Sequence, residues 1–369
     1  MPGLEWEDKW LRTIEELYKK LLLFPKQEFG RFPTPLHRLA RVSEDFGVNL
    51  YIKRDDLCGY NLYGGNKIRK LQYLLGDALA KGKSAVYTFG ATQSNHAMQT
   101  AACARSCGMQ PILFLEEMIE QDGTGARANL LLDQLYQAEI FVISAQGQPI
   151  GQVTERAYQK AEQVIRAYED AGIECYRIET GGANPLGCLG FVEGYAELIS
   201  QLREQKIRAD YLCLPVGTGG TYAGLVAGKA LLGGTAEILG YTVLDKTEEF
   251  ENELLQLARQ TVELLGEQAE VSAADIRLKR EYYGKGYELP DDAANKAIRY
   301  LAATEGILTD PVYSGKALAG VFDQIQKGYI AKGSNIVFWH TGGTTALFAE
   351  KEILGTLVEE KQVKENGKF

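Results

Sequence analysis

The chain has 369 residues, of which 45% are hydrophobic and 24% charged, enough to bury one large core or two smaller ones. Forty basic side chains stand against 49 acidic ones, and the net charge of −9 argues against the basic footprint of proteins that bind nucleic acid or anionic membranes. We therefore expect a small-molecule partner and neither nucleic acid nor membrane as a ligand.

The chain start and the cysteines bear on location and redox state. The first 17 residues lack the basic segment and apolar core of a signal peptide, and no apolar run approaches the roughly 20 residues of a membrane span, so we expect a cytoplasmic protein. Six cysteines without CxxC pairs predict buried free thiols. The histidines His37, His96 and His340 stand apart and predict no metal site. The polar tail 359–369 is expected to fray.

Short β-branched or aromatic runs alternate with longer amphipathic segments, the pattern of βαβ units around a mainly parallel sheet. An amphipathic helix begins near Lys67. Three units in a row then predict one compact subdomain, with strands at 84–91, 111–117 and 139–144 and helices at 93–107, 124–137 and 150–171. The pattern resumes with helix 189–205, strand 209–217, helix 221–232, strand 237–243, a helix near 247–265 and strand 334–343. The fold class is therefore α/β.

The first candidate site is the glycine run after the strand predicted at 209–217. Gly217, Gly219 and Gly220 permit positive φ and a close backbone approach, and the N–H groups that open the next helix can bind an anion such as phosphate. The dinucleotide motif GxGxxG needs glycine where Tyr222 stands, and no GK[ST] closes a P-loop. The alternative is a glycine-rich turn that only packs a helix against a strand.

The second candidate is a polar run at the start of the helix predicted at 93–107. Thr92, Ser94 and Asn95 supply hydroxyl and amide groups where the helix begins, and one of them can cap the helix, which by itself explains the pattern. The surplus groups can bind a carboxylate and a neighbouring phenolic oxygen. His96 is most simply a satisfied histidine on the helix face.

The third candidate is Lys67, which brings a cation to a helix start that already carries positive partial charge. An ordinary lysine has a pKa of about 10.4, and lowering it to near 7.5 costs roughly 4 kcal/mol. A helix terminus contributes only about 0.3–1 kcal/mol, so burial, cations such as Arg69 and Lys70, or covalent linkage to a carbonyl must supply the rest. A Schiff-base lysine is the favoured interpretation, and an exposed lysine in the first helical turn is the alternative.

The segments GGNKIRKL, GATQSNH, PVGTGGTYAG, DPVYSGKALAG and HTGG occur in this order along the chain. Their order and spacing resemble the pyridoxal-phosphate (PLP) enzymes of the tryptophan synthase β fold, in the branch of D-cysteine desulfhydrase and 1-aminocyclopropane-1-carboxylate (ACC) deaminase. The resemblance covers about residues 30–350. It implies two three-layer αβα domains with mainly parallel sheets, a larger PLP-binding domain of 1–82 plus 191–369 and a smaller inserted one of 83–190. It also implies a homodimer with PLP in the cleft.

The resemblance implies a role for each matching residue. Lys67 matches the lysine that binds PLP and exchanges the proton at Cα, and Lys70 matches a position that reaches the phosphate. The phosphate would also be held by Gly217, Thr218, Gly219, Gly220 and Thr221. Asn95 matches the amide on the PLP hydroxyl, and Thr341 a hydroxyl near the pyridine nitrogen. The carboxylate would be held by Ser94 with Gln93 and His96 adjacent, and Tyr287 and Tyr313 match two active-site tyrosines.

A neutral hydroxyl at Thr341 cannot keep the pyridine protonated as a carboxylate would, which leaves the cofactor a weaker electron sink. β-Elimination needs less of that sink than transamination does. We therefore predict that Lys67 removes the Cα proton while a tyrosine pair assists at Cβ. With D-cysteine as the favoured substrate, thiolate leaves and the products are pyruvate, sulfide and ammonia.

Two departures from the family pattern bear on the substrate. Ser314 follows Tyr313 where ACC deaminases carry glutamate, which favours the desulfhydrases, whereas Met98 stands where desulfhydrases carry an arginine. The alternatives are ACC deaminase, L-cysteate sulfo-lyase and another β-substituted or diamino-acid ammonia-lyase. An amino-acid racemase is less favoured because no second-face base can be assigned. From another class, the alternative is a protein that binds PLP or amino acids without catalysis.

Overall fold

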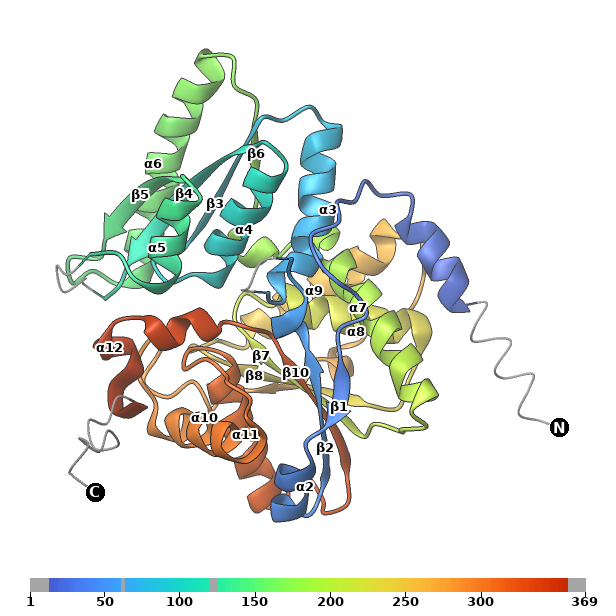
Figure 1. The fold of residues 1–369 in the computed structure, drawn as a ribbon. Coiled ribbons are helices and arrows are strands. Elements are labelled where there is room, and N and C mark those ends of the chain that lie inside the picture. Colours follow the sequence, from blue (N-terminus) through green and yellow to red (C-terminus); the bar gives the residue numbers. More distant parts are fainter. Residues whose placement is uncertain (1–12, 61–63, 120–124, 358–369) are drawn as a thin grey trace, which may run out of the picture.

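The computed structural model describes residues 13–60, 64–119 and 125–357, and the tail expected to fray lies outside these ranges. Two sheets form the framework (Figure 1). The larger sheet has the order β1-β2-β10-β7-β8-β9 and the smaller one β5-β4-β3-β6. The expectation of α/β architecture with mainly parallel sheets is confirmed, since every strand pair except β1–β2 is parallel.

The larger sheet draws its strands from both ends of the chain: β1 (Leu36–Arg38), β2 (Asn49–Arg54), β7 (Tyr211–Val216), β8 (Glu237–Thr242), β9 (Leu278–Lys279) and β10 (Asn335–His340). Its central strands β7, β8 and β10 are almost wholly buried, as expected for a parallel sheet covered on both faces. The antiparallel strand β1 and the two-residue strand β9 form the edges.

Helices cover both faces of the larger sheet. One face packs against α7 (Pro185–Glu204), α8 (Gly220–Leu232) and α9 (Glu249–Leu264) around Leu212, Leu214 and Trp339. The other packs against α2 (Ala40–Phe46), α10 (Asp292–Glu305) and α11 (Ser314–Gln326) around Ile52, Cys213 and Phe338. Residues 13–21 are also helical, and the short helix α12 (Lys351–Leu354) lies near the chain end.

The smaller sheet comes from one continuous part of the chain: β3 (Ala85–Ala91), β4 (Gln110–Glu117), β5 (Glu139–Ser144) and β6 (Cys175–Arg177). Its helices are α4 (Asn95–Ser106), α5 (Ala128–Leu135) and α6 (Ile150–Asp170). The helix α3 (Lys67–Ala80) runs between the two sheets in Figure 1 and packs against α7 and α4. Short 3₁₀ helices complete the fold: η1 (Asp55–Leu57), η2 (Thr180–Gly182), η3 (Ala273–Asp275), η4 (Thr344–Phe348) and η5 (Gly355–Leu357).

The predicted strands and helices are present, with shifts at their ends. The helix expected from 93 begins at Asn95 because Ser94 caps it, with its Oγ accepting from the N–H of Ala97 at 3.2 Å. The helix expected at 124–137 begins at Ala128, and residue 124 lies outside the described ranges. The strand expected to reach 343 ends at His340.

The cysteines are free thiols, as expected from their spacing. All six are unpaired, five of them buried and Cys107 partly exposed. Across the residues that the structure describes, no helix is long and apolar enough to cross a bilayer, and no cluster of histidine, cysteine and acidic side chains could hold a metal ion.

Candidate active site

A cavity of about 320 Å³ lies where the carboxyl ends of strands from both sheets meet. Its walls include Ala91 and Glu116 from the smaller sheet, and Val216 and Thr341 at the ends of β7 and β10. Parallel α/β sheets commonly bind ligands at this edge. Twelve of the residues predicted to form the site line this cavity: Lys67, Lys70, Ser94, Asn95, His96, Gly217, Thr218, Gly219, Thr221, Tyr287, Tyr313 and Thr341.

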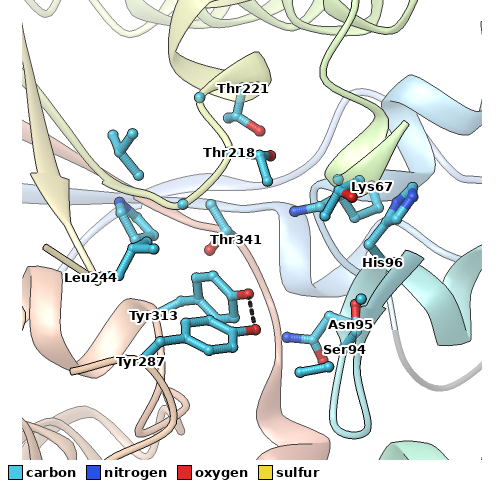
Figure 2. Close-up of a pocket in the computed structure, with 18 of the residues that line it drawn as sticks. Lys67, Ser94, Asn95, His96, Thr218, Thr221, Leu244, Tyr287, Tyr313 and Thr341 are labelled. Atoms are coloured by element: carbon cyan, nitrogen blue, oxygen red, sulfur yellow. Dashed lines mark hydrogen bonds between the residues drawn. The ribbon is translucent and has the colours of Figure 1, made fainter. Parts of the chain in front are cut away.

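Lys67 is the partly exposed first residue of α3, and its amine projects into the cavity (Figure 2). The amine donates a hydrogen bond to the Oδ1 of Asn66 at 3.1 Å. Burial, reinforced by the charge of Lys70, holds the pKa of the Lys67 amine well below its usual range, against an opposing effect of Asp310. A neutral amine is a nucleophile, so Lys67 is poised to form a covalent bond with a carbonyl compound.

Arg69 does not contribute to this effect, contrary to the expectation that it would be one of the cations near Lys67. Two residues along a helix turn the side chain by about 200°. Arg69 therefore lies on the opposite face of α3, where it is 2% exposed and forms buried ion pairs with Asp55 and Glu197. Trp339 donates its Nε1–H to the same Asp55 at 2.8 Å. This network ties the first turn of α3 to β10 and α7.

The glycine run forms an anion cradle at the start of α8. Gly219 is the N-cap of the helix with φ +87°, and a Cβ there would lie 2.1 Å from a methyl carbon of Leu254. A Cβ on the next residue, Gly220, would lie 2.8 Å from the amine of Lys70, which places this cation directly beside the cradle. The first N–H groups of a helix have no intrahelical acceptor and are free to bind an anion. Burial lowers the pKa of Lys70 to about 8.

Asn95 and Ser94 lie at the start of α4. The Oδ1 of Asn95 accepts a hydrogen bond from the Nδ2 of Asn129 at 2.8 Å, which fixes the orientation of the amide. The Nδ2 of Asn95 donates to no other described residue, and Figure 2 shows it directed into the cavity. Ser94 lines the cavity and caps the helix at the same time, so both interpretations of the polar run find support.

The other members of the polar run differ in position. Gln93 does not line the cavity, because its side chain bonds with the backbone of Arg127 and Asn129 and with Glu350. His96 lines the cavity and is 3% exposed, with its Nε2 2.8 Å from the hydroxyl of Thr88. Burial, with smaller effects of Lys67 and Lys70, holds the pKa of His96 well below its usual range, so the imidazole is neutral.

Two phenols face Lys67 from another side of the cavity (Figure 2). The hydroxyl oxygens of Tyr287 and Tyr313 lie 2.6 Å apart in a hydrogen bond, and burial raises the pKa of both groups. Both are therefore protonated near neutral pH, and one O–H of the pair remains available to a ligand. Asp310 sets the start of α11 by accepting from the backbone N–H groups of Tyr313 and Ser314 at 2.6 and 2.8 Å.

Ser314 and Gly220 complete the predicted set but do not line the cavity. The hydroxyl of Ser314 is fully buried and contacts the carboxyl of Asp310 and the carbonyl oxygen of Gly342. Gly220 is the first residue of α8, directly behind the cradle. His37 and His340 lie elsewhere, and the Nε2 of His340 is 2.8 Å from the carbonyl oxygen of Leu308.

The residues to which the sequence reasoning assigned no role include Glu116 and Lys246, which line the cavity, and Asn129 and Asp310, which hydrogen-bond with residues that line it. Asp310 is the first residue of the matched segment DPVYSGKALAG but was assigned no role, and an acid just before a helix start is a signal that could have identified it. Lys246 lines the cavity, and its amine lies 4.0 Å from the ring centroid of Phe250. That ring packs against Gly219, so Lys246 belongs to the same end of the cavity as the cradle.

Comparisons with known proteins identify the family and several relatives of this chain. Residues 28–342 match the family described as pyridoxal-phosphate dependent enzyme. A Salmonella typhimurium protein named D-cysteine desulfhydrase is 38% identical over 89% of this chain and 97% of its own length. A Pyrococcus abyssi protein named provisionally as a 1-aminocyclopropane-1-carboxylate deaminase is 37% identical over 88% of this chain and 93% of its own. The solved structure of an ACC deaminase homologue superimposes with a TM-score of 0.81 and 35% identity, over 93% of this chain and 99% of that one.

Proposed function

The chain belongs to the pyridoxal-phosphate dependent enzyme family, and from that premise we propose that it is a lyase that eliminates the β-substituent of a small amino acid. D-Cysteine is the favoured substrate, and the products are pyruvate, sulfide and ammonia. The names of the relatives at 37–38% identity support this class of reaction. The observation that carries the proposal is that one cavity is lined by the Lys67 amine, whose pKa burial lowers, and by the hydrogen-bonded phenol pair.

The cavity fits the cofactor of the family. A phosphate dianion suits the cradle at Gly219, where no Cβ can be accommodated, together with the amine of Lys70. The amide of Asn95, which has no acceptor of its own among the described residues, suits the ring hydroxyl, and the hydroxyl of Thr341 suits the ring nitrogen. Lys67 would hold the aldehyde carbon covalently. The backbone N–H groups and hydroxyls of residues 217–221 would complete the phosphate site, with Thr221 held by the Nδ2 of Asn66 at 2.9 Å.

Pyridoxal phosphate supplies an electron sink for the negative charge that develops at the substrate Cα. The role of Lys67 is to take the Cα proton on its Nζ, because the pKa that burial lowers leaves more of the amine unprotonated and able to accept a proton. The start of α4 binds the substrate carboxylate, because Ser94 and the free N–H groups of the first helical turn face the cavity there. The neutral hydroxyl of Thr341 would give the ring nitrogen no charged partner, which would favour reactions in which the Cβ substituent departs as the Cα proton is lost.

The phenol pair donates a hydrogen bond to the leaving group. One of the hydroxyls of Tyr287 and Tyr313 donates its proton to the oxygen of the other. The proton of the accepting hydroxyl is then free to stabilise the departing thiolate. Because the pKa of each phenol is raised, the pair stays protonated through the neutral range. The elimination product, 2-aminoacrylate, hydrolyses in water to pyruvate and ammonia. Atoms balance as cysteine plus water giving pyruvate, sulfide and ammonia.

The division of the chain into domains is part of the proposal. A larger cofactor-binding domain would comprise 1–82 and 191–369, and a smaller inserted domain 83–190. The separate sheets support this division, since all strands of the smaller sheet fall between Ala85 and Arg177. We further propose a cytoplasmic homodimer, as the family resemblance implies.

ACC deaminase is the second candidate, supported by the name of the Pyrococcus abyssi relative and by the likeness to the solved ACC deaminase homologue. The position that distinguishes the two activities in the family pattern is occupied by Ser314, whose hydroxyl contacts Asp310 and does not line the cavity. L-Cysteate sulfo-lyase, a diamino-acid ammonia-lyase and a binding protein without catalysis stay as further alternatives. Met98, where an arginine was expected, is 1% exposed in α4, which agrees with a packing role.

A substrate panel tests the proposal. Purified holoenzyme is incubated with D- and L-cysteine, D-serine, L-cysteate, 2,3-diaminopropionate and ACC, and keto acid, ammonia and sulfide are measured. We expect the highest kcat/KM with D-cysteine and equal amounts of pyruvate and sulfide. Release of 2-oxobutanoate from ACC at a higher kcat/KM would favour the second candidate. A spectral change with amino acids but no product from any of them would favour the binding protein.

A further inference from the structure

Three buried carboxyl groups lie around the side of the cavity that Tyr287 lines. Glu116 is 9% exposed near the end of β4 and forms part of the cavity wall. Glu288 follows Tyr287 in the chain and is 2% exposed, and Glu350 is the N-cap of α12 and is 4% exposed. None of these acids belongs to a motif that the sequence reasoning identified, and none has a role in the proposed reaction.

The three acids come from different segments that meet beside the start of α4. The backbone N–H of Thr92 donates to the carbonyl oxygen of Glu116 at 3.2 Å. The side-chain amide of the next residue, Gln93, donates to the Oε1 of Glu350 at 3.3 Å. Glu288 lies close enough to both carboxyl groups to interact with their charge. Burial, with added effects of Glu350 and Glu116, raises the pKa of Glu288 to about 8.

Two carboxyl oxygens of this group have no hydrogen-bond partner among the described residues. They are the Oε1 of Glu288 and the Oε2 of Glu350, each fully buried. The nearby cation Lys316 does not satisfy them, because its amine donates to the backbone oxygens of Tyr283 and Gly286 at 2.9 and 2.7 Å. Glu116 lines the cavity, whereas Glu288 and Glu350 do not, so the two enclosed acids act on a ligand through charge across the wall and favour one that brings a positive charge.

The opposite end of the cavity carries the positive charge. Lys70 lies beside Gly220, and Lys246 lies over Phe250, whose ring packs against Gly219. Both amines are therefore at the anion cradle. A substrate bound between Lys67 and the phenol pair would have these cations on the phosphate side and the three carboxyl groups on the side of Tyr287.

We propose that Glu116, Glu288 and Glu350 select the charge of the β-substituent, so that the site accepts a neutral or positively charged group and rejects an anionic one. Because the raised pKa of Glu288 leaves that carboxyl group largely protonated near neutral pH, the repulsion comes from the other two acids, and a like charge brought near a poorly hydrated carboxylate is repelled far more strongly than in water. The inference rests on the proposed function and narrows it. Amino acids with a β-thiol or β-amine are the substrate class, and a β-sulfonate or β-carboxylate is excluded.

Binding to the holoenzyme tests the charge preference, and the spectral change with 2,3-diaminopropionate, itself a candidate substrate, is read before product accumulates. Asparagine and aspartate of each configuration differ by one charge at nearly equal size, and 2,3-diaminopropionate supplies a positive β-substituent. Each is titrated into the holoenzyme while the cofactor absorbance is followed. We expect asparagine to bind at least tenfold more tightly than aspartate of the same configuration, and diaminopropionate at least as tightly as asparagine. Equal affinities, tighter binding of aspartate, or no spectral change with any of them would overturn the inference.

A pair of neighbouring variants assigns the effect to the cavity wall. Glu116→Gln removes one acid from the wall, and Glu117→Gln removes the same charge from the adjacent residue, whose side chain points to the other face of β4. We expect Glu116→Gln to narrow the gap between asparagine and aspartate at least threefold and Glu117→Gln to leave it unchanged. Equal narrowing by both would show a general charge effect and overturn the assignment.

The outcomes separate this inference from the proposed function. A holoenzyme that prefers asparagine to aspartate but forms no product from any β-substituted amino acid would overturn the lyase and leave the charge preference standing. An active D-cysteine lyase that binds asparagine and aspartate equally would overturn the charge preference and leave the lyase standing.

Discussion

Replacing Arg69 with methionine should destabilise the fold through a group that never touches the cavity. The guanidinium forms a two-bond pair with Asp55 at 2.8 and 2.9 Å and another with Glu197 at 3.0 Å for both bonds. Lys53 adds a second cation to the same cluster through its ion pair with Glu197. Methionine preserves much of the side-chain volume but leaves two buried carboxylates facing one cation.

The expected loss follows from the burial of these charges. Removing one partner of a buried ion pair costs about 3–5 kcal/mol. An unfolding entropy of roughly 2.1 cal/mol/K per residue gives about 0.8 kcal/mol/K for 369 residues, so the melting midpoint should fall by about 4–6 °C. The exposed Arg38 is the matched control, and Arg38→Met should change the stability by less than about 0.5 kcal/mol.

The same network predicts a pH dependence. Burial alone would raise the pKa of the Glu197 carboxyl, but Arg69 and Lys53 outweigh burial and hold it at about 2. A lowered carboxyl pKa stabilises the fold above the ordinary value near 4.5 and stops doing so as the pH falls toward 2. The gap in midpoint between wild type and Arg69→Met should therefore be constant from pH 7 to about 5 and narrow below about 4.5. Differential scanning calorimetry measures both effects, and a midpoint lowered by less than about 1 °C at pH 7 would refute the reasoning.

Three further changes probe the site directly. Gly219→Ala should weaken cofactor binding at least tenfold in an absorbance titration, because the added Cβ has no room. Gly266→Ala is the control: Gly266 also has positive φ, but its Cβ would lie in open space, so cofactor binding should not change. Tyr313→Phe should lower kcat on D-cysteine about 10²-fold with an unchanged cofactor spectrum, since it removes one of two paired hydroxyls; unchanged kcat would exclude the pair. Lys316→Met should release the loop before Tyr287 and lower kcat while cofactor affinity stays the same, and equal loss of both would contradict this positioning role.

The central elements could be predicted because buried parallel strands are continuous apolar runs. Strands β3, β4, β5, β7 and β8 were found within two residues of their observed ends. Strands β1, β2, β6 and β9 were not predicted, and in β1 and β2 the reason is that the sequences LHR and NLYIKR mix apolar and charged residues. In β2 that mixture has a structural cause, since Lys53 is buried against Glu197 and no periodicity rule anticipates a buried cation in a strand.

In the candidate site, too, local signals in the sequence could be recognised, but contacts made by the tertiary fold could not. Lys67 and the cradle carry local signals, a lysine at a helix start and glycines after a strand, and the cavity contains both. Arg69 was misread because sequence proximity to Lys67 does not give the direction of a helical side chain. Glu116, Glu288 and Glu350 lie far apart in the chain, and only the tertiary fold brings them together: Glu116 and Glu350 each contact a residue just before α4.

The proposed function depends on one covalent bond, between the amine of Lys67 and the cofactor aldehyde. Borohydride reduction of the holoenzyme, followed by peptide mass spectrometry, fixes the position of that bond. We predict the phosphopyridoxyl group on Lys67, and its absence from Lys70 and Lys246, which line the same cavity. Modification of either of those two lysines instead, or of no lysine at all, would contradict the proposal.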